Sequence, residues 1–424
     1  MPVLPTSYLF YIVSAIICIF FVYFSIKDIT LGLSIFLFSL VFPVSLNAGF
    51  TKIDPYEIML LILILIYVIK EKKLTLFTTA VELPFICLII ISFISMLSSQ
   101  NLFASIKQIL KLIEYFLVFI ISLNIMMGKP DRGRTIYFTM IYICLMVCIY
   151  GFIIDSIYTD RDTAKSIFVH YNIYGSYINL YLPFTISLLF FKKKLQKKEL
   201  LMWIFINIIL ITALVLSLSR GSWVSLLSVI LFYLFLKRRD KKKFYLTIII
   251  LLISGIISVI LMPDFILSRV NSIFKYSTDT AILHRFDLWK SSFKMFLHHP
   301  LIGIGTGNFD YVYPDYAIVG PAYKLVANHA NNMYINILTE TGLSGFIIFM
   351  WYITVLWKEV INSYKKKYSD EFLYLFSVGF SGILLALCIH GFFDYMLYHP
   401  RMALNFMVIL AIFFVFKEDV RRKE

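Results

Sequence analysis

The chain consists mainly of apolar segments, each about long enough to cross a bilayer, and a single long polar segment interrupts them. Of its 424 residues, 60% are hydrophobic and only 15% are charged. Soluble proteins of this length rarely have such a composition, whereas a bundle of membrane-spanning helices requires it. The sequence therefore predicts an all-α polytopic membrane protein.

The hydropathy pattern predicts about 12–13 transmembrane helices. We expect residues 1–424 to form a single transmembrane bundle, in which residues 263–332 form one large outer-face (periplasmic) loop. No internal repeat is evident, which argues against an inverted-repeat transporter. The expected spans are 8–26, 30–46, 56–69, 80–98, 109–127, 135–155, 175–191, 200–218, 222–236, 245–262, 334–357, 371–389 and 402–416.

The net charge of +14 is concentrated in short loops beside these spans. Such lysine and arginine clusters mark cytoplasmic loops, so they indicate topology and do not indicate a nucleic-acid partner. With these clusters inside, the segment 263–332 and the turns at Ser219–Gly221 and His390–Arg401 lie outside. The clusters are Lys70–Lys73, Lys129–Arg134, Lys192–Lys198, Lys237–Lys243, Lys365–Lys367 and Arg421–Lys423.

Cysteines and histidines are distributed very differently in the sequence. All five cysteines fall inside apolar runs, which indicates buried thiols and neither a disulfide framework nor a metal site. All seven histidines instead fall on expected outer segments or span ends. They are His170, His284, His298, His299, His329, His390 and His399.

Arginines on the expected outer side need an explanation, because the positive-inside rule depletes them there. Arg161 lies between two aspartates, so local pairing explains it. For each of the others, a contact with a lipid phosphate is the simple alternative. If several of them converge, they would form an anion site, since guanidinium groups bind phosphate bidentately, and a membrane-embedded diphosphate is an obvious ligand. These others are Arg220, Arg269, Arg285 and Arg401.

The polar segment contains two recognisable patterns. The run His284–Trp289 precedes a helix-like stretch that reaches Leu297, and a glycine-rich stretch, His298–Phe309, follows. Neither a preceding strand nor a following Lys-Ser/Thr is present, so the stretch is not a nucleotide loop, and it predicts a tight turn where backbone approaches something closely. The paired histidines lack a carboxylate at helical spacing, which disfavours zinc.

Polar residues also enter the span that follows the polar segment. Asn332, Asn336 and Glu340 recur there at helical spacing. A carboxylate inside a membrane helix is expensive and is usually functional or paired. Structural pairing of Glu340 and a catalytic role both remain open.

Several of these motifs, in this order, resemble the O-antigen ligase and O-antigen polymerase superfamily of lipid-linked glycan transferases. The resemblance covers about Lys165 to the C-terminus, and the N-terminal third is similar only in hydropathy. The motifs are Ser219-Arg220-Gly221, Arg285 with Trp289, His299 to Gly305, His329 to Gly345, Gly391 to Tyr395 with Tyr398-His399-Pro400, and His170-Tyr171-Asn172 through Pro183.

The resemblance implies a metal-independent, inverting glycosyltransferase without a cofactor. Such an enzyme moves a glycan from undecaprenyl diphosphate to an acceptor sugar hydroxyl, of lipid A–core in the ligases, on the outer face of the bacterial inner membrane. Arginines would stabilise the departing diphosphate, and a histidine would serve as base. For catalysis we expect His329, Arg285 and Arg220. For substrate binding we expect Arg269, Asn172, Asn332, Tyr334, Trp289, His299, Asp394 and Arg401.

One departure from the family pattern concerns the base. The ligase motif has a histidine followed by Asn, Ser or Gln and then by nine residues up to a glycine. Counted back from Gly342, that histidine position holds Asn331, and the nearest histidine is His329. Either His329 serves as the base, or leaving-group stabilisation drives the reaction.

We therefore expect an O-antigen ligase-type glycosyltransferase of the bacterial inner membrane, with its active site facing the periplasm. Its expected partners are an undecaprenyl-diphosphate-linked glycan donor, a lipid A–core or other glycan acceptor, and membrane lipids, without nucleic acid. A polysaccharide polymerase and a protein O-oligosaccharyltransferase are alternatives within the class. A lipid-linked glycan transporter is the alternative from another class, and it would place polar residues along a path through the membrane centre.

Overall fold

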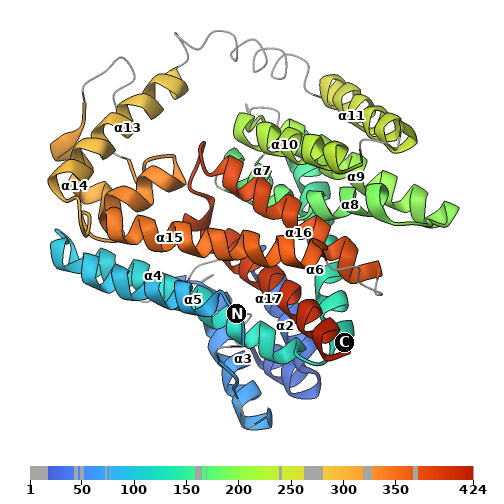
Figure 1. The fold of residues 1–424 in the computed structure, drawn as a ribbon, viewed down its shortest axis with the longest axis horizontal. Coiled ribbons are helices and arrows are strands. Elements are labelled where there is room, and N and C mark those ends of the chain that lie inside the picture. Colours follow the sequence, from blue (N-terminus) through green and yellow to red (C-terminus); the bar gives the residue numbers. More distant parts are fainter. Residues whose placement is uncertain are drawn as a thin grey trace, which may run out of the picture. The chain divides into compact units, whose positions relative to one another are not determined.

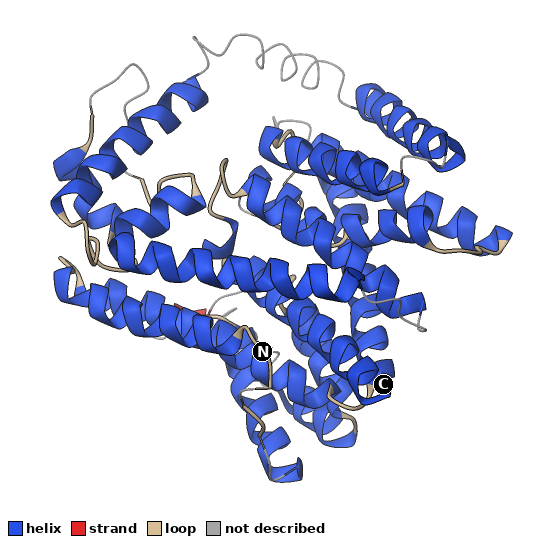
Figure 2. Cartoon of the chain, viewed as in Figure 1, coloured by secondary structure: helices blue, strands red, loops and turns tan. Residues whose placement is uncertain are grey.

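The computed structural model describes residues 18–42, 46–47, 52–71, 74–76, 78–157, 165–168, 170–237, 241–261, 280–318, 327–365 and 371–423. Nearly all of these residues are helical (Figure 2). The only strands in these ranges are β1 (Leu46–Asn47) and β2 (Lys52–Ile53), which form one short antiparallel pair. The predicted all-α polytopic membrane fold is confirmed.

Six helices in the described residues are long and apolar enough to cross a membrane, and five shorter apolar helices accompany them. The expected spans that lie in the described residues coincide largely with helices, but the expected span 30–46 is helical only to Ser39, and Leu46 belongs to β1. The long candidates are Leu102–Met126, Pro130–Ile154, Tyr171–Phe191, Lys197–Leu216, Met333–Ser363 and Glu371–His390; the shorter ones are Cys18–Lys27, Ile29–Ser39, Glu82–Ser98, Arg220–Leu236 and Ile248–Ile260.

The chain divides into two compact units. The first comprises Met1–Leu76, Leu117–Val147 and Leu404–Glu424. Its helices are α2 (Ile29–Ser39), α3 (Pro55–Glu71) and parts of α5 (Leu102–Met126), α6 (Pro130–Ile157) and α17 (Pro400–Lys423). Helix α2 packs on α3, and Phe119 of α5 meets Phe414 of α17 edge to face.

The second unit comprises Phe77–Phe116 and Cys148–Ala403, and it contains the residues that carry the resemblance. Within it, α16 packs on α8, α10, α15 and α7, while α4 and α13 pack on α15 (Figure 1). Its helices are α4 (Glu82–Ser95), α7 (Tyr171–Asn179), α8 (Leu182–Phe191), α9 (Lys197–Leu216), α10 (Arg220–Leu236), α11 (Lys241–Leu261), α13 (Thr280–His298), α14 (Phe309–Tyr316), α15 (Met333–Lys365) and α16 (Glu371–His390).

The expected span at 175–191 is a broken helix. Helix α7 ends at Asn179 and α8 starts at Leu182, with Pro183 in the first turn of α8. Proline suits a first turn because it has no N–H to donate, and it cannot continue a preceding helix. The polar residues Asn172, Ser176 and Asn179 of α7 are all buried, so this short helix faces protein.

The glycine-rich stretch forms the tight turn that the sequence predicts. Gly303, Gly305 and Gly307 have φ values of 73°, 101° and 75°, a region that disfavours any residue with a side chain. A Cβ on Gly303 would lie 2.4 Å from the carbonyl oxygen of Glu340. The predicted close approach of backbone is therefore present, and its partner is helix α15.

The turn is bound to a break in α15. Gly342 has a φ of 66°, and the helix is not regular there. The Gly305 N–H donates to the Glu340 carbonyl at 3.1 Å, and the Leu343 N–H donates to the Pro300 carbonyl at 2.9 Å. The turn thus satisfies backbone groups that the break exposes, which an apolar environment requires.

Candidate functional site

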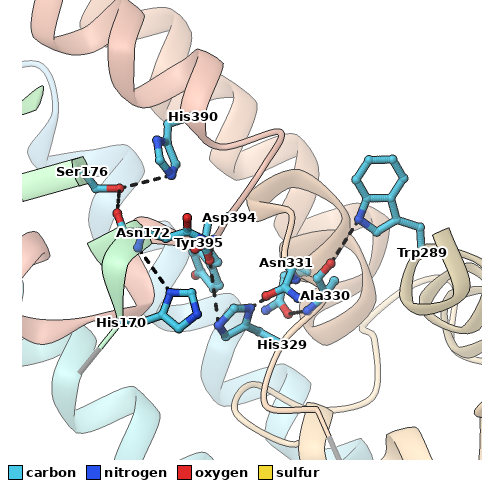
Figure 3. Close-up of polar contacts among 11 residues, drawn as sticks. His170, Asn172, Ser176, Trp289, His329, Ala330, Asn331, His390, Asp394 and Tyr395 are labelled. Atoms are coloured by element: carbon cyan, nitrogen blue, oxygen red, sulfur yellow. Dashed lines mark hydrogen bonds and ion pairs between the residues drawn. The ribbon is translucent and has the colours of Figure 1, made fainter. Parts of the chain in front are cut away.

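Polar side chains from three separate segments of the second unit meet in one cluster (Figure 3). His170 precedes α7, residues 327–332 precede α15, and residues 391–399 connect α16 to α17. All three segments lie at helix ends, where backbone groups and loop side chains are available for chemistry.

His329 and Asp394 form the central pair of this cluster. The His329 Nε2 atom lies 4.0 Å from Asp394 Oδ1, and the two side chains are 14% and 10% exposed. The Asn331 N–H donates to His329 Nδ1 at 3.1 Å. Because a backbone N–H can only donate, the proton of the neutral ring sits on Nε2 and faces the carboxylate.

The electrostatics of the pair keep the carboxylate charged and the imidazole neutral. Burial lowers the pKa of His329 more than the neighbouring Asp394 raises it. Burial alone would raise the pKa of Asp394, but His329, His390, His399 and the Tyr395 N–H together lower it below its usual value. At neutral pH the pair therefore presents an N–H donor beside an ionised carboxylate.

Several hydrogen bonds fix the backbone on either side of His329. Trp289 of α13 donates its indole N–H to the Ala330 carbonyl at 3.1 Å, and the Ala330 N–H donates to Asn336 Oδ1 at 3.0 Å. Asn331 takes a left-handed φ of 49°, which asparagine tolerates better than most residues. The Met333 N–H donates to the Gly391 carbonyl at 2.7 Å and so joins the two loops of the cluster.

Aromatic rings surround the pair. The His329 ring centroid lies 5.3 Å from that of Tyr398, 6.5 Å from that of Tyr395 and 6.3 Å from that of His399. Burial lowers the pKa of His399 to about 4, and it lowers the pKa of His170 as well. These histidines are therefore neutral near pH 7.

Another histidine, His390, joins helices next to this pair, and its carbonyl accepts the Asp394 N–H at 3.0 Å. It is fully buried at the end of α16, with Ser176 Oγ 3.1 Å from Nε2 and Ser222 Oγ 3.4 Å from Nδ1. Asn172 adds a second link, because its Oδ1 accepts from Ser219 Oγ at 3.0 Å. These bonds join α7, α10 and α16 behind the cluster.

Of the expected substrate-binding residues, Trp289, Asp394, Asn172, Asn332 and Tyr334 lie in or beside the cluster. Several of them already form hydrogen bonds with backbone groups of the protein. Asn332 caps α15 by accepting from the N–H groups of Tyr334 and Ile335, and the Tyr334 hydroxyl donates to the Cys388 carbonyl at 2.8 Å. Their part in substrate binding stays a prediction.

The expected arginines are placed unevenly. Arg285 of α13 is one of the charges that, after burial, lower the pKa of His170, so it lies within electrostatic reach of the cluster. Arg220 is the first residue of α10, directly after the capping Ser219. Arg401 is the second residue of α17, and His299, which is half-buried, follows the end of α13. Arg269 and Arg161 lie outside the described residues.

Sequence reasoning omitted His399, Tyr395, Tyr398 and Lys111 from the expected site. Lys111 Nζ lies 5.7 Å from the centre of the Tyr398 ring. A signal for Lys111 was present, because a charged residue inside the expected span 109–127 is expensive and usually functional. Tyr395 and Tyr398 belong to one of the motifs that carry the resemblance, but tyrosine is common at membrane interfaces, so they were not named as site residues.

The described residues give no support for metal binding. Within these residues, no group of three or more His, Cys, Asp or Glu side chains is arranged to hold a metal ion. The expectation that the protein works without a metal remains a prediction.

Comparison with known proteins bears on the same part of the chain. Residues 205–350 match the family model described as O-Antigen ligase. This match supports the expected resemblance to the O-antigen ligase superfamily over that segment. The matched segment includes Arg220, Arg285, Trp289 and His329. The chain is also 28% identical over 174 residues to an uncharacterised protein of Haemophilus influenzae, and the match covers 38% of this chain and 43% of that relative. The match thus spans less than half of the curated relative.

The structure also bears on the departure from the ligase motif at Asn331. Asn331 occupies the position of the ligase motif's histidine, yet its N–H is the group that orients His329. The imidazole is therefore present beside Asp394, supplied from two residues earlier in the loop.

Proposed function

We propose that this protein transfers a glycan from a lipid-linked diphosphate to a sugar hydroxyl, at the cluster around His329 and Asp394. The observation that carries the proposal is the 4.0 Å separation of His329 Nε2 and Asp394 Oδ1. It is longer than a hydrogen bond, and an acceptor hydroxyl about 2.8 Å from both atoms would fit beside it. The superfamily match supports the reaction class.

The protonation states assign the roles in the acceptor step. The His329 Nε2–H donates to the acceptor oxygen and orients it, and that hydroxyl donates its own proton to the ionised Asp394. The acceptor oxygen then attacks the anomeric carbon as the bond from that carbon to the phosphate oxygen breaks. The proton goes to Asp394, and the electron pair leaves with the diphosphate. Asp394 is thus the base, and His329 positions the hydroxyl.

Arg220 and Arg285 are proposed to stabilise the departing diphosphate. Arg220 lies at the N-terminus of α10, where the helix dipole also favours an anion, and Ser219 ties that end to Asn172 of α7. Arg285 lies within electrostatic reach of His170, which precedes the same helix α7. Fixed guanidinium groups of this kind can stabilise charge that develops on phosphate oxygens.

Donor and acceptor are proposed as undecaprenyl-diphosphate glycan and lipid A–core, with a donor-linked glycan or a protein hydroxyl as the alternatives. The test is transfer in vitro by the purified protein in lipid nanodiscs, with a synthetic undecaprenyl-diphosphate glycan and all three acceptors in competition. Preferential product on lipid A–core supports a ligase, and polymer on the donor supports a polymerase. If the donor is not consumed with any of the three acceptors, glycan transfer is refuted.

The arginine assignment has its own test. Arg285→Ala and Arg220→Ala should each remove about 2–5 kcal/mol of transition-state stabilisation and thereby slow transfer. Replacement by lysine should restore little activity, because lysine keeps the charge but cannot bind phosphate bidentately. Arg134→Ala is the matched control, since Arg134 forms an ion pair with the exposed Asp131 at 3.4 Å. Wild-type turnover of folded Arg285→Ala would remove that residue from the donor site.

The proposed periplasmic orientation can be tested by labelling. In a variant whose five native cysteines are replaced, a cysteine at the exposed Lys290 of α13 should react with an impermeant maleimide added outside. A cysteine at the exposed Lys194, in a basic loop, should not react. The opposite pattern would place the cluster on the wrong side for a periplasmic reaction.

A further inference from the structure

We propose that α5, which lies before the segment matched by the family model, supplies a binding subsite for the acceptor glycan through Lys111 and Tyr115, beside Tyr398. The ligand class is a sugar ring that carries hydroxyl and anionic substituents, such as a phosphorylated sugar. The inference rests on the proposed function, and it assigns substrate recognition to residues that the sequence patterns did not single out.

The first step of the argument is the position of Tyr398. Its ring lies 5.3 Å from the His329 ring and, in addition, 5.7 Å from Lys111 Nζ. Tyr395 is 5.8 Å from Tyr398, ring centre to ring centre. One aromatic side chain therefore connects the His329–Asp394 pair to the ammonium group of α5. A sugar whose hydroxyl reaches the pair would extend along this ring.

The second step is the face that α5 presents. Lys111 and Tyr115 are four residues apart in a continuous helix, so they lie on the same face, one turn apart. Tyr115 is only 2% exposed and lies within electrostatic reach of Tyr395 and Tyr398. The helix thus directs a cation and a phenol toward the 391–399 turn.

The third step is that polar atoms around these tyrosines are left without partners. Among the described residues, the Tyr115 hydroxyl makes no hydrogen bond although it is buried, and neither does Glu340 Oε1. Glu340, 4% exposed on α15, lies within electrostatic reach of both Tyr395 and Tyr398. Buried polar atoms without partners are costly, and ligand hydroxyls would satisfy them.

The chemistry of the set suits a sugar. An aromatic ring offers an apolar face, a phenol and a carboxylate exchange hydrogen bonds with hydroxyls, and an ammonium binds anionic oxygens. Specificity of this kind comes from a few placed polar groups in a largely apolar site. The subsite would therefore select the acceptor and leave binding of the lipid diphosphate to the arginines.

The decisive variant is Tyr115→Phe, because it removes only a hydroxyl that satisfies nothing in the protein. If Tyr115 had only a structural role, the loss of this hydroxyl would not lower the stability of the protein. Tyr352→Phe is the matched control, since Tyr352 of α15 is also buried, at 3% exposure, and its hydroxyl also lacks a partner among the described residues. The Tyr352 ring meets the ring of Phe85 of α4 edge to face, with 5.6 Å between the ring centres.

The experiment measures direct binding of a phosphorylated core-type oligosaccharide, and of the same oligosaccharide after dephosphorylation, to the full chain in nanodiscs. Tyr115→Phe should weaken binding of both by about 3–10-fold, the effect of one neutral hydrogen bond. Lys111→Met should weaken binding of the phosphorylated form by 10-fold or more and of the dephosphorylated form by less. Tyr352→Phe should bind both as the wild type does.

The outcomes separate this inference from the proposed function. If the wild-type protein binds neither oligosaccharide, or if Tyr115→Phe and Lys111→Met bind as the wild type does, the subsite is wrong. If binding behaves as expected while the wild type transfers no glycan from the lipid-linked donor, the subsite stands and the transferase activity fails. Where transfer occurs, Tyr115→Phe should raise the KM for the acceptor and leave the KM for the donor unchanged.

Discussion

His329 and His390 lie in the same unit and at the same kind of place, beside a helix end, yet they have different surroundings. His390 is fully buried, and serine hydroxyls of the protein lie next to both of its ring nitrogens. His329 is 14% exposed, has one nitrogen held by a backbone N–H, and directs the other toward a carboxylate 4.0 Å away. The first arrangement is complete within the protein, and in the second the Nε2–H and the carboxylate stand slightly beyond hydrogen-bond distance.

The difference shows how a structural histidine can be distinguished from a functional one. Histidine is suited to both roles, and its position in the sequence is similar in both cases. What differs is whether the chain itself supplies the last hydrogen-bond partner. A pair of polar groups fixed at slightly more than hydrogen-bond distance indicates a site for an external group.

The largest effect should come from Asp394→Asn. Removing the proposed base should lower the transfer rate by about 10²–10⁴-fold while binding of the lipid-linked donor is kept. Single-turnover transfer and donor binding, measured on the same preparation, check this. The control is Asp315→Asn at an exposed position of α14, which should transfer as the wild type does. A fully active Asp394→Asn protein would show that the His329–Asp394 pair is structural, as the surroundings of His390 are.

The second effect concerns His390 and should appear in stability. His390→Ala leaves a cavity and removes the partner of Ser176 and Ser222, so it should lower the free energy of unfolding by about 2–4 kcal/mol. The transfer rate per folded molecule should stay near that of the wild type. Denaturation and active-site-normalised rates measure the two quantities, with the exposed His298→Ala as control. A stable protein with abolished transfer would move His390 into the catalytic group.

A smaller effect is expected where His329 is positioned from a distance. Trp289→Phe removes the indole N–H that binds the Ala330 carbonyl, so the transfer rate should fall by about 3–10-fold, which corresponds to one hydrogen bond. Trp223→Phe removes an equivalent bond, to the Leu214 carbonyl, between α9 and α10. If both variants lose the same fraction of activity, the bond to Ala330 has no special part in placing His329.

The smallest effect is a change in the pH dependence of stability. The pKa of His399 is about 4 in the folded protein, below its ordinary value of 6.5, so the unfolded chain takes up the proton first as pH falls. His399 therefore leaves stability intact above pH 6.5 and reduces it between pH 6.5 and about 4. His399→Gln should lower the slope of the free energy of unfolding against pH by up to about 1.4 kcal/mol per pH unit, which corresponds to one proton. Unfolding measured across this window checks this. An unchanged slope would contradict the buried neutral state.

The sequence predicted most of the helices, because apolar runs of bilayer length have few other stable structures in a membrane. The expected span 334–357 lies within α15, and the expected helix-like stretch up to Leu297 lies within α13, which already begins at Thr280. The tight turn at Gly303–Gly307 was also predictable, since alternating glycines suit a backbone that needs positive φ.

The contacts that build the site were harder to predict. No local pattern pairs His329 with Asp394, because their proximity depends on how α15 and α16 pack at their ends. The break between Asn179 and Leu182 was also not predicted, although Pro183 marked it, because the surrounding residues are uniformly apolar. The expected site contained no residue of α5, because its charged residues were taken from the outer segments and Lys111 lies within an expected span.

The interlocking glycines of the 300–305 turn and α15 have a consequence for suppressor genetics. A Cβ on Gly303 or Gly342 would meet backbone atoms at 2.4 Å, which no trimming of a neighbouring side chain can relieve. A Cβ on Gly382 would instead meet side-chain atoms, the hydroxyl of Tyr233 at 2.2 Å and Pro183 Cβ at 2.8 Å, and a smaller residue at 233 would relieve the closer of these contacts. Selection for regained function should therefore return only true revertants of Gly303→Ala, whereas Gly382→Ala should also yield second-site changes at Tyr233.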